Sequence, residues 1–412
     1  MKVLWFEVTT PQRYKNSGQV LGGWQDSLEQ MIQNCNDIDL FVAFESSNKS
    51  DSVKIIDGIT YVPMYVEYSM ADRIRNKWNF EIYARKIEIV AREVAENIKP
   101  DLVHVFGTEW PFGRIAKYIK CPVVIHIMGA MIPYVNALCP PNFKFDDVIA
   151  SIPFWKVKKR WGYSCVLRRQ CSWAKGEKKV WNAVENYMGR TEWDRAVSEM
   201  LHPGRKYFHV DEAIRPVFLD DKNRWVGQTD NKIRLFSTGC SSFWKGPDLL
   251  LQTAKILKDR GVEFDWLVAG AMEPQVKKCV ETRYGTRFAE NGIRLLGFVS
   301  SDRLMRELCK STMYVHTAYI DNSPNSVCEA QCLGVPVIST NVGGISSIVH
   351  HQDDGFLVPA NDPWQMANAI IELADDGERM VRYSEKSRAL AHRRHSVDSI
   401  KTQLLNCYRS LV

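Results

Sequence analysis

Residues 315–349 constrain the fold of this chain more than any other stretch. They begin with a short apolar strand that ends near Ala318 and continue through a polar turn, residues 321–326, into a helix that Gly334 closes. A second apolar strand, residues 335–339, follows, and a glycine pair then opens what the pattern predicts to be another helix. Two strands joined through a helix run parallel, so this stretch predicts a βαβ unit of a parallel sheet.

Short apolar runs alternate with helical periodicity along the rest of the chain as well. Further strands are predicted at residues 3–6, 40–44, 101–107, 123–127, 186–190, 233–237, 264–269, 293–296 and 355–358. The clearest amphipathic helix covers residues 83–98, and a terminal helix covers residues 397–411. Since 412 residues exceed what one hydrophobic core normally serves, we expect two α/β domains with parallel sheets.

The polar turn before Gly334 has the composition of an anion-binding site. Pro324 and the small residues Ser323, Asn325 and Ser326 suit a helix N-terminus, where backbone N–H groups lack partners and the helix dipole favours negative charge. Two carboxylates frame the turn, Asp321 before the helix and Glu329 inside it. The turn is therefore predicted to bind a phosphate, with a carboxylate available to each of two parts of a longer ligand.

These residues resemble a known family. The D-x7-E spacing, the following A-Q-C-L-G-V-P-V-I-S-T and the G-G-I-S-S-I-V are similar to the sugar-nucleotide motif of family 4 retaining glycosyltransferases. The resemblance implies the GT-B fold, in which two Rossmann-like, doubly wound domains face a cleft. It places the acceptor-side domain at residues 1–205, completed by the helix at 396–412, and the nucleotide-sugar domain at residues 206–395. The family usually has E-x7-E, so Asp321 is a departure that concerns donor-sugar geometry.

The resemblance also implies roles for residues of the second domain. Lys245, in T-G-C-S-S-F-W-K-G-P-D, matches a lysine that grips the donor diphosphate, whereas Cys240 stands where an arginine is often found. Gly297 matches the segment beside the nucleotide base. Glu329 would bind ribose hydroxyls and Asp321 the transferred hexose. By itself, a lysine before a helix would be a surface residue.

In the first domain the signals are weaker and alternatives stay open. The loop with Gly22 and Gly23 would lie over the donor phosphates, or it is a plain tight turn. His126 would orient the donor sugar, or it is a hydrogen-bonded core histidine. Arg190, at a predicted strand end, would meet an acceptor phosphate, or it forms an ordinary ion pair. Thr108, Glu109 and Trp110 follow a strand at the edge where open α/β sheets bind ligands.

Residues 154–181 have an unusual composition. Nine basic residues alternate with four tryptophans and oppose one acidic residue, Glu177: Lys156, Lys158, Lys159, Arg160, Arg168, Arg169, Lys175, Lys178 and Lys179, with Trp155, Trp161, Trp173 and Trp181. The pattern suits an anionic membrane surface, where Trp lies at the interface and Lys or Arg meets phosphate. The alternative is a solvated basic helix whose tryptophans pack inward. A net charge of +6 is modest for a nucleic-acid-binding protein, which we do not expect.

Composition places the protein in a reducing compartment. Eleven cysteines are scattered without C-x-x-C pairs or metal-site spacing, which favours free thiols in a cytoplasm. The N-terminus does not resemble a signal peptide, and the apolar run at 121–139 is broken by His126, Gly129 and Pro133. We expect a cytoplasmic protein, soluble or peripheral on the inner membrane face.

Together these features predict a retaining, metal-independent glycosyltransferase without a cofactor. Its donor would be a UDP- or GDP-sugar and its acceptor a hydroxyl of a glycan or lipid-linked glycan. We find no D-x-D cluster at a predicted strand end that could hold a metal ion. Alternatives on the same fold are a sugar-nucleotide epimerase, a phosphorylase, which the length disfavours, and a non-catalytic partner subunit that binds sugar nucleotides.

Overall fold

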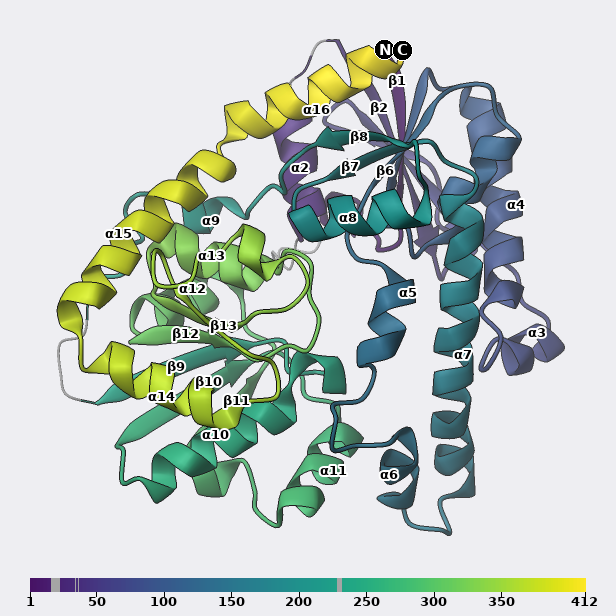
Figure 1. Ribbon diagram of the computed structural model, residues 1–412. Coiled ribbons are helices and arrows are strands. Elements are labelled where there is room, and N and C mark those ends of the chain that lie inside the picture. Colours follow the sequence, from purple (N-terminus) through teal and green to yellow (C-terminus); the bar gives the residue numbers. More distant parts are fainter. Residues whose placement is uncertain (16–22, 34, 36, 228–231) are drawn as a thin grey trace. The chain divides into compact units, whose positions relative to one another are not determined.

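The computed structural model describes the chain from residue 1 to residue 412, apart from residues 16–22, 34, 36 and 228–231. The chain forms two compact units (Figure 1). Unit 1 consists of residues 1–135, 161–213 and 396–412, and unit 2 consists of residues 136–160 and 214–395. Each unit contains one sheet with helices on both faces.

Unit 1 contains a sheet of eight strands in the order β3-β4-β2-β1-β5-β6-β7-β8. The strands are β1 (Lys2–Glu7), β2 (Asp39–Ser46), β3 (Lys54–Ile56), β4 (Ile59–Tyr65), β5 (Leu102–Phe106), β6 (Val123–His126), β7 (Asn186–Gly189) and β8 (Lys206–His209). All neighbouring strands are parallel except β3 and β4, which form an antiparallel hairpin. Asp57 and Gly58 at its turn both have positive φ, as a two-residue hairpin requires.

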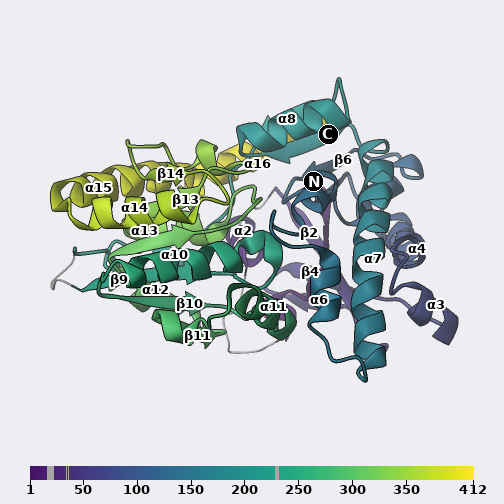
Figure 2. The ribbon, with the colours of Figure 1, turned by 60° about the horizontal axis from the view of Figure 1, so that its bottom comes forward.

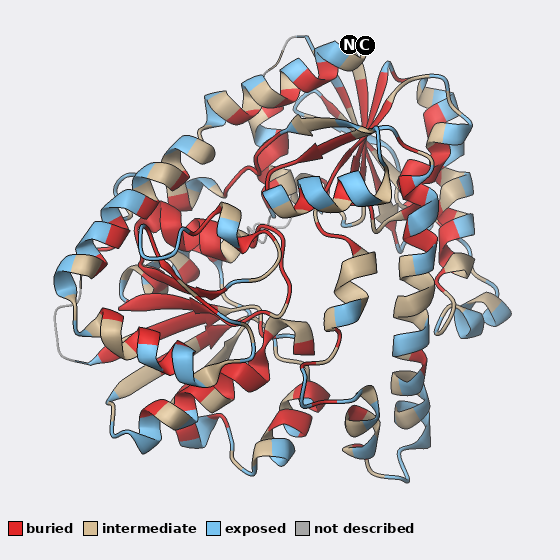
Figure 3. Ribbon diagram, in the orientation of Figure 1, coloured by how far each residue is buried: buried red, intermediate tan, exposed pale blue. Residues whose placement is uncertain are grey.

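Helices cover both faces of this sheet. The helices of unit 1 include α2 (Trp24–Ile32), α3 (Met70–Arg75), α4 (Glu81–Ile98), α5 (Met131–Tyr134), α7 (Val157–Trp181), α8 (Glu192–Leu201) and α16 (Val397–Leu411), of which α3 and α5 bury no residue. The strands of the sheet centre are buried (Figure 3), and β1 contributes the fully buried Trp5. The indole of Trp5 donates to the Tyr408 hydroxyl of α16 at 2.9 Å, so the C-terminal helix is part of the core of unit 1.

Unit 2 contains a sheet of six parallel strands in the order β11-β10-β9-β12-β13-β14. The strands are β9 (Ile233–Thr238), β10 (Phe264–Ala269), β11 (Ile293–Gly297), β12 (Met313–His316), β13 (Val337–Thr340) and β14 (Phe356–Val358). The helices are α6 (Phe145–Ala150), α9 (Pro216–Leu219), α10 (Pro247–Asp259), α11 (Pro274–Tyr284), α12 (Ser301–Cys309), α13 (Asn325–Leu333), α14 (Pro363–Ala374) and α15 (Gly377–Arg394). Figures 1 and 2 show α10 and α14 on one face of this sheet and α12 and α13 on the other.

Both sheets are doubly wound, which confirms the predicted fold class. In each sheet the first strand of the unit lies inside the sheet, and later strands are added on one side of it and then on the other. This reversal of strand order, the switch point, falls between β1 and β5 in unit 1 and between β9 and β12 in unit 2. Ligands of open α/β sheets bind at the carboxyl ends of the strands at such a switch point. The fold therefore selects the loops after β1, β5, β9 and β12 as places for function.

Three details of the sequence interpretation differ from the structure. The strand β8 pairs with β7, so unit 1 continues to residue 213, beyond the expected boundary at 205. Residues 136–160 cluster with unit 2 although the expected domain at 1–205 included them. The pair Gly343 and Gly344 opens a single 3₁₀ turn, Ile345–Ser347, where another helix was predicted.

Candidate functional site

Three loops of unit 2 meet at the carboxyl edge of its sheet. The loop after β12 is bonded to the loop after β9, since Thr317 Oγ1 donates to the Lys245 carbonyl at 2.9 Å and the Tyr319 N–H donates to the Trp244 carbonyl at 2.7 Å. The loop after β13 joins them, because the Gly344 N–H donates to the Asp321 carbonyl at 2.9 Å. Hydrogen bonds to backbone carbonyls thus fix the three loops relative to one another.

Two glycines make this close approach possible. Gly246, with a φ of +69°, ends the β9 loop, and a Cβ there would lie 1.9 Å from the Thr317 carbonyl oxygen. Gly343, with a φ of +53°, lies against Asp321, and its Cβ would lie 1.8 Å from the Asp321 carbonyl oxygen. Both conformation and space therefore require glycine at these positions.

Lys245 and Asp321 come from the two strands that flank the switch point of unit 2, and their side chains meet. The ammonium nitrogen lies 2.5 Å from Asp321 Oδ2, and His316 Nε2 lies 3.3 Å from the same oxygen. Burial alone would raise the pKa of Asp321, but the charge of Lys245 and the neighbouring His316 outweigh it and hold the pKa well below its ordinary value. Asp321 is therefore an ionised carboxylate, and Lys245 keeps 26% of its side chain exposed beside it.

The helix α13 begins four residues after Asp321, and its N-cap residue provides no side-chain hydrogen bond to its N-terminus. Pro324 is its N-cap residue, and its first turn contains no acidic residue. Ser326 in this turn accepts a hydrogen bond from the buried Tyr314 hydroxyl at 2.8 Å, and that hydroxyl lies 2.8 Å from Thr238 Oγ1. Ser326 is thereby held in place by β9 and β12, while Asn325 beside it is half-buried. The arrangement leaves a helix N-terminus of positive potential next to the Lys245 ammonium.

Glu329 lies buried one turn further along α13, where it meets an arginine that the sequence interpretation missed. Arg215 directs Nε and Nη2 at Glu329 Oε1, at 2.8 and 2.7 Å, and its Nη1 donates to Ser301 Oγ at 3.1 Å. Burial raises the pKa of Glu329 to about 7, and Arg215 opposes this effect. Arg215 precedes Pro216, and an Arg-Pro pair at the start of a domain carries no local signal of such a contact.

Cys240 and Gly297 are two further positions of unit 2 that the sequence analysis singled out, and their environments differ. Cys240 is buried, and burial raises the pKa of its thiol to about 12, so it stays neutral and does not replace the charge of an arginine. Gly297 ends β11 with a φ of +66°, and its carbonyl accepts from the Gly270 N–H at 2.8 Å. No atom would lie within 4 Å of a Cβ at Gly297, so a ligand has room to approach its backbone.

In unit 1, His126 is fully buried at the end of β6. Its Nε2 lies 3.1 Å from the Val210 carbonyl oxygen, its Nδ1 has no hydrogen-bond partner in the described part of the chain, and its ring packs edge-on against Trp24. Burial, with the charge of Arg190, lowers the pKa of His126 to about 3, so the imidazole is neutral. The contact of Nε2 with Val210 is what the interpretation of His126 as a hydrogen-bonded core histidine expects. The Nδ1 atom could still bind a ligand, as the alternative interpretation requires.

Arg190 follows β7 and is buried. Its Nε lies 2.6 Å from Glu212 Oε2, and its Nη1 donates to the Ile127 carbonyl at 3.2 Å. This is the ion pair that the sequence interpretation left open, and a contact of Arg190 with an acceptor stays a prediction. Gly23 is the N-cap residue of α2, where its N–H donates to Asp26, whereas Gly22 lies outside the described residues.

The basic, Trp-rich stretch forms most of the helix α7, and its two ends differ. Near the C-terminal end, Trp181 is buried and Trp173 stacks on Phe80 with ring centroids 4.6 Å apart, so these tryptophans pack inward. Near the N-terminal end, Trp155 and Trp161 are 67% and 41% exposed. Each of the two interpretations therefore describes one part of the stretch. None of the helices in the described residues is long and apolar enough to cross a bilayer.

A separate pocket of about 320 Å³ lies along α10, near Tyr284 and Trp364. Its lining residues belong to none of the three loops that hold Lys245 and Asp321. The pocket is therefore distinct from the loop cluster described above.

The architecture of the chain is that of the two-domain GT-B glycosyltransferases. Sucrose-phosphate synthase from Thermosynechococcus elongatus matches it with a TM-score of 0.69 over 100% of this chain and 98% of that one, at 13% identity. HepE from Anabaena in complex with UDP-glucose matches with a TM-score of 0.66 over 100% of both chains, at 15% identity. At these identities the likeness shows the fold alone.

The sequence of most of unit 2 matches a family model. Residues 220–390 match the model for glycosyl transferases group 1, and this match includes Lys245, the turn at 321–326 and Glu329. The chain therefore carries a group 1 glycosyltransferase domain, which confirms the resemblance. The amylovoran biosynthesis glycosyltransferase AmsK of Erwinia amylovora is 24% identical over 205 residues, which are 48% of this chain and 49% of that protein. The chain spans about half the length of the curated relatives it matches first.

Proposed function

We propose that the protein is a retaining, metal-independent glycosyltransferase that moves a hexose from a nucleoside diphosphate sugar to a hydroxyl of a glycan or lipid-linked glycan. The observation that carries this proposal is the position of Lys245, whose partly exposed side chain lies at the switch point of unit 2 and pairs with Asp321 in the loop that leads into the N-terminus of α13. Two sources of positive charge at one sheet edge suit a diphosphate.

Positive charge at this place would act on the leaving group. As the bond between sugar and diphosphate breaks, negative charge grows on the diphosphate, so groups aimed at it stabilise the transition state more than the ground state. Lys245 can donate three hydrogen bonds and needs only one for Asp321. The ammonium would therefore bind the diphosphate while Asp321 accepts hydrogen bonds from the hexose hydroxyls.

The remaining predicted residues would bind the two ends of the donor. Glu329 would accept hydrogen bonds from the ribose hydroxyls, with Arg215 holding one of its oxygens in place and compensating its charge. Gly297 would offer backbone groups to the base, and His126 would direct its neutral imidazole at the transferred sugar. The UDP-glucose bound to HepE and the role of AmsK in amylovoran biosynthesis support a nucleotide-sugar donor and a glycan acceptor.

A panel of UDP- and GDP-sugars tests the proposal. The true donor should raise the melting temperature, because a ligand that binds only the folded state stabilises it. With that donor and a glycan acceptor, the anomeric configuration of the product, measured by NMR, should equal that of the donor, and EDTA should leave the rate unchanged. An inverted product, conversion of the donor into its epimer, or no transfer from any donor would contradict the proposal.

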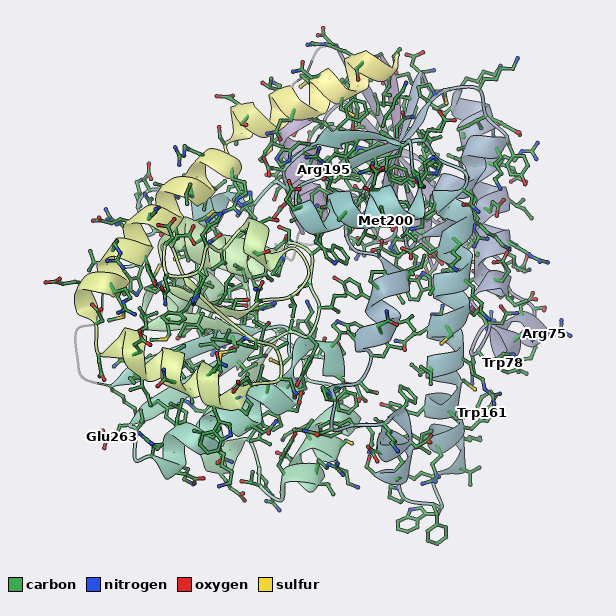
Figure 4. The ribbon with its side chains drawn as sticks, viewed as in Figure 1. Arg75, Trp78, Trp161, Arg195, Met200 and Glu263 are labelled. Carbon is green, nitrogen blue, oxygen red and sulfur yellow. The ribbon has the colours of Figure 1, made fainter. Side chains whose placement is uncertain are left out.

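We also propose that the protein lies in the cytoplasm and binds the inner membrane face through an exposed basic and apolar surface of unit 1. This α3 surface consists of Met70, Ile74, Arg75, Lys77, Trp78 and Trp161. Met70 is 72% and Ile74 45% exposed, and the Lys77 ammonium lies 4.7 Å above the Trp161 ring. In Figure 4, Arg75, Trp78 and Trp161 lie near one another at α3 and α7. Exposed apolar groups among cations match an anionic lipid surface.

Vesicle flotation tests this surface, with a double substitution on the exposed face of α8 as the control. Arg75→Ala with Lys77→Ala should weaken binding to anionic vesicles by about tenfold or more, because each cation near an anionic membrane contributes separately. Arg195→Ala with Met200→Ser, which changes an exposed cation and an exposed apolar residue on α8, should bind like the wild type (Figure 4). Equal binding of the wild type to neutral and anionic vesicles would contradict the electrostatic proposal.

A further inference from the structure

Glu109 lies at the switch point of unit 1, in the place that corresponds to that of Asp321 in unit 2. It lies three residues after β5, which flanks β1 where the strand order of the sheet reverses. The carboxyl ends of β1 and β5 form the edge at which an open α/β sheet binds its ligand. The topology therefore places this carboxyl group where a substrate is expected.

The fold makes room for the Glu109 carboxyl and fixes its backbone. Gly107 has a φ of +89°, and a Cβ there would lie 2.7 Å from Glu109 Oε2 and 2.8 Å from Cδ, so only glycine allows the carboxyl to occupy this space. The indole N–H of Trp173 donates to the Glu109 carbonyl. The position of the carboxyl is thus built from two elements, β5 and α7.

One oxygen of this carboxyl is unused by the protein. Glu109 Oε2 is buried and has no hydrogen-bond partner in the described ranges of the chain. The neighbouring Glu177 differs, because it accepts from Met131 N–H at 3.0 Å, Ile132 N–H at 2.9 Å and Thr108 Oγ1 at 2.7 Å. A buried polar oxygen without a partner costs on the order of 1–3 kcal/mol, and a ligand that supplies the missing donor removes this cost.

The charges around Glu109 indicate what kind of donor fits. Burial, with a smaller contribution from Glu177, raises the pKa of Glu109 to about 8, while backbone hydrogen bonds from Glu109 and Thr108 and the charge of Arg190 oppose the rise. A carboxylate beside a second carboxylate repels phosphate and favours a neutral hydroxyl as its partner.

We infer that Glu109 binds the acceptor hydroxyl, so that its Oε2 accepts a hydrogen bond from the saccharide hydroxyl that receives the sugar. This inference rests on the proposed transferase function and adds to it a residue that positions the acceptor. Because an ionised carboxylate accepts this bond and a protonated one need not, transfer should rise with pH as Glu109 ionises.

The test compares Glu109→Gln with Glu192→Gln, a matched change at an exposed position of α8. We expect Glu109→Gln to raise the acceptor KM and to lower kcat/KM for the acceptor by about tenfold or more, because an amide presents an N–H₂ group where a carboxylate presents an oxygen. Donor affinity and slow donor hydrolysis without acceptor should stay at wild-type values. The wild-type rate should increase between pH 7 and 9, and the variant should lose that increase.

Stability measurements keep the test independent of misfolding. Glu109→Gln replaces a buried carboxyl whose Oε2 has no hydrogen-bond partner in the described residues, so its melting temperature should equal or exceed that of the wild type. Wild-type acceptor kinetics and an unchanged pH profile in Glu109→Gln would overturn the inference while leaving the transferase proposal intact. Absence of transfer by the wild-type protein from every donor would instead overturn the transferase proposal and this inference with it.

Discussion

Lys245→Ala should separate the structural role of this lysine from its catalytic role. In the structure its ammonium lies 2.5 Å from Asp321 Oδ2, and the Asp321 side chain is only 11% exposed. The substitution leaves a buried carboxylate with His316 as its remaining neighbour, at 3.3 Å. Loss of one partner of a fully buried ion pair costs roughly 3–5 kcal/mol. Because Lys245 is 26% exposed, we expect about 2 kcal/mol of stability to be lost.

The expected effect on turnover is larger than the effect on stability. Removal of one donor to a developing oxyanion costs about 2.7–4 kcal/mol of transition-state stabilisation. That energy corresponds to a decrease in kcat of roughly a hundredfold to a thousandfold. Denaturant unfolding measures the first quantity, and initial rates of transfer from the donor found in the sugar-nucleotide panel measure the second.

A double variant distinguishes the two roles. Lys245→Ala combined with Asp321→Asn removes both charges, so the stability lost in the single variant should largely return while turnover stays low. Lys245 would be excluded from the mechanism by a turnover of the single variant within a factor of about three of the wild type. Recovery of turnover in the double variant would show that the unpaired carboxylate, and not the missing cation, had caused the loss.

The same pair predicts a pH effect of defined sign. The pKa of Asp321 lies below its ordinary value of 3.8, so the stability that this carboxylate contributes is present above pH 3.8 and is lost as the pH falls below it. Acid unfolding of the wild type should show this loss. In Lys245→Ala this loss of stability should be smaller, because the positive charge that lowers the pKa of Asp321 is gone. The same loss of stability below pH 3.8 in the variant and the wild type would show that Lys245 does not lower the pKa of Asp321.

Three further predictions concern unit 2. Glu329→Ala should weaken binding of the nucleoside diphosphate by about tenfold or more, measured by calorimetry, because the ribose hydroxyls lose their acceptor and Arg215 its partner; unchanged affinity would remove Glu329 from the nucleotide site. The pKa of Glu329 is raised from 4.5 to about 7, so its contribution to stability should decline as the pH rises from 4.5 to 7, and Glu329→Gln should abolish this decline in urea unfolding at successive pH values. Gly343→Ala should destabilise the protein by several kcal/mol and lower activity, because its Cβ would lie 1.8 Å from the Asp321 carbonyl oxygen. Gly261→Ala, also at positive φ but in open space, is the control, and equal losses would refute the steric explanation.

Several local features of the chain could be predicted from local sequence. Helix α13 ends at Gly334 as its position after the last apolar residue indicates, since only glycine adopts that left-handed conformation without strain. Thr191 caps α8 and the pair Asp57 and Gly58 forms the hairpin turn, both as their residue types require. Asp321 could be selected because it stands in a polar turn after a buried strand, whereas Lys245 could be selected only through the resemblance to the family motif.

The pairs between distant residues could not be predicted in the same way. Arg215 meets Glu329 across 114 positions, and Thr108 meets Glu177 across 69, through contacts that no local pattern encodes. The edge strand β8 was missed because none of its residues is buried, so the sequence offers little apolar signal there.

The sequence by itself determined the parallel α/β class, which residues lie in the loops after the strands, and where the backbone needs glycine. These features could be predicted because periodicity and backbone conformation are properties of neighbouring residues. Only the tertiary structure decided which of those loops meet, that Lys245 is paired with Asp321, and that Glu109 has an oxygen without a partner. Burial and electrostatic environment arise from residues far apart in the chain, so they exist only once the sheets have formed.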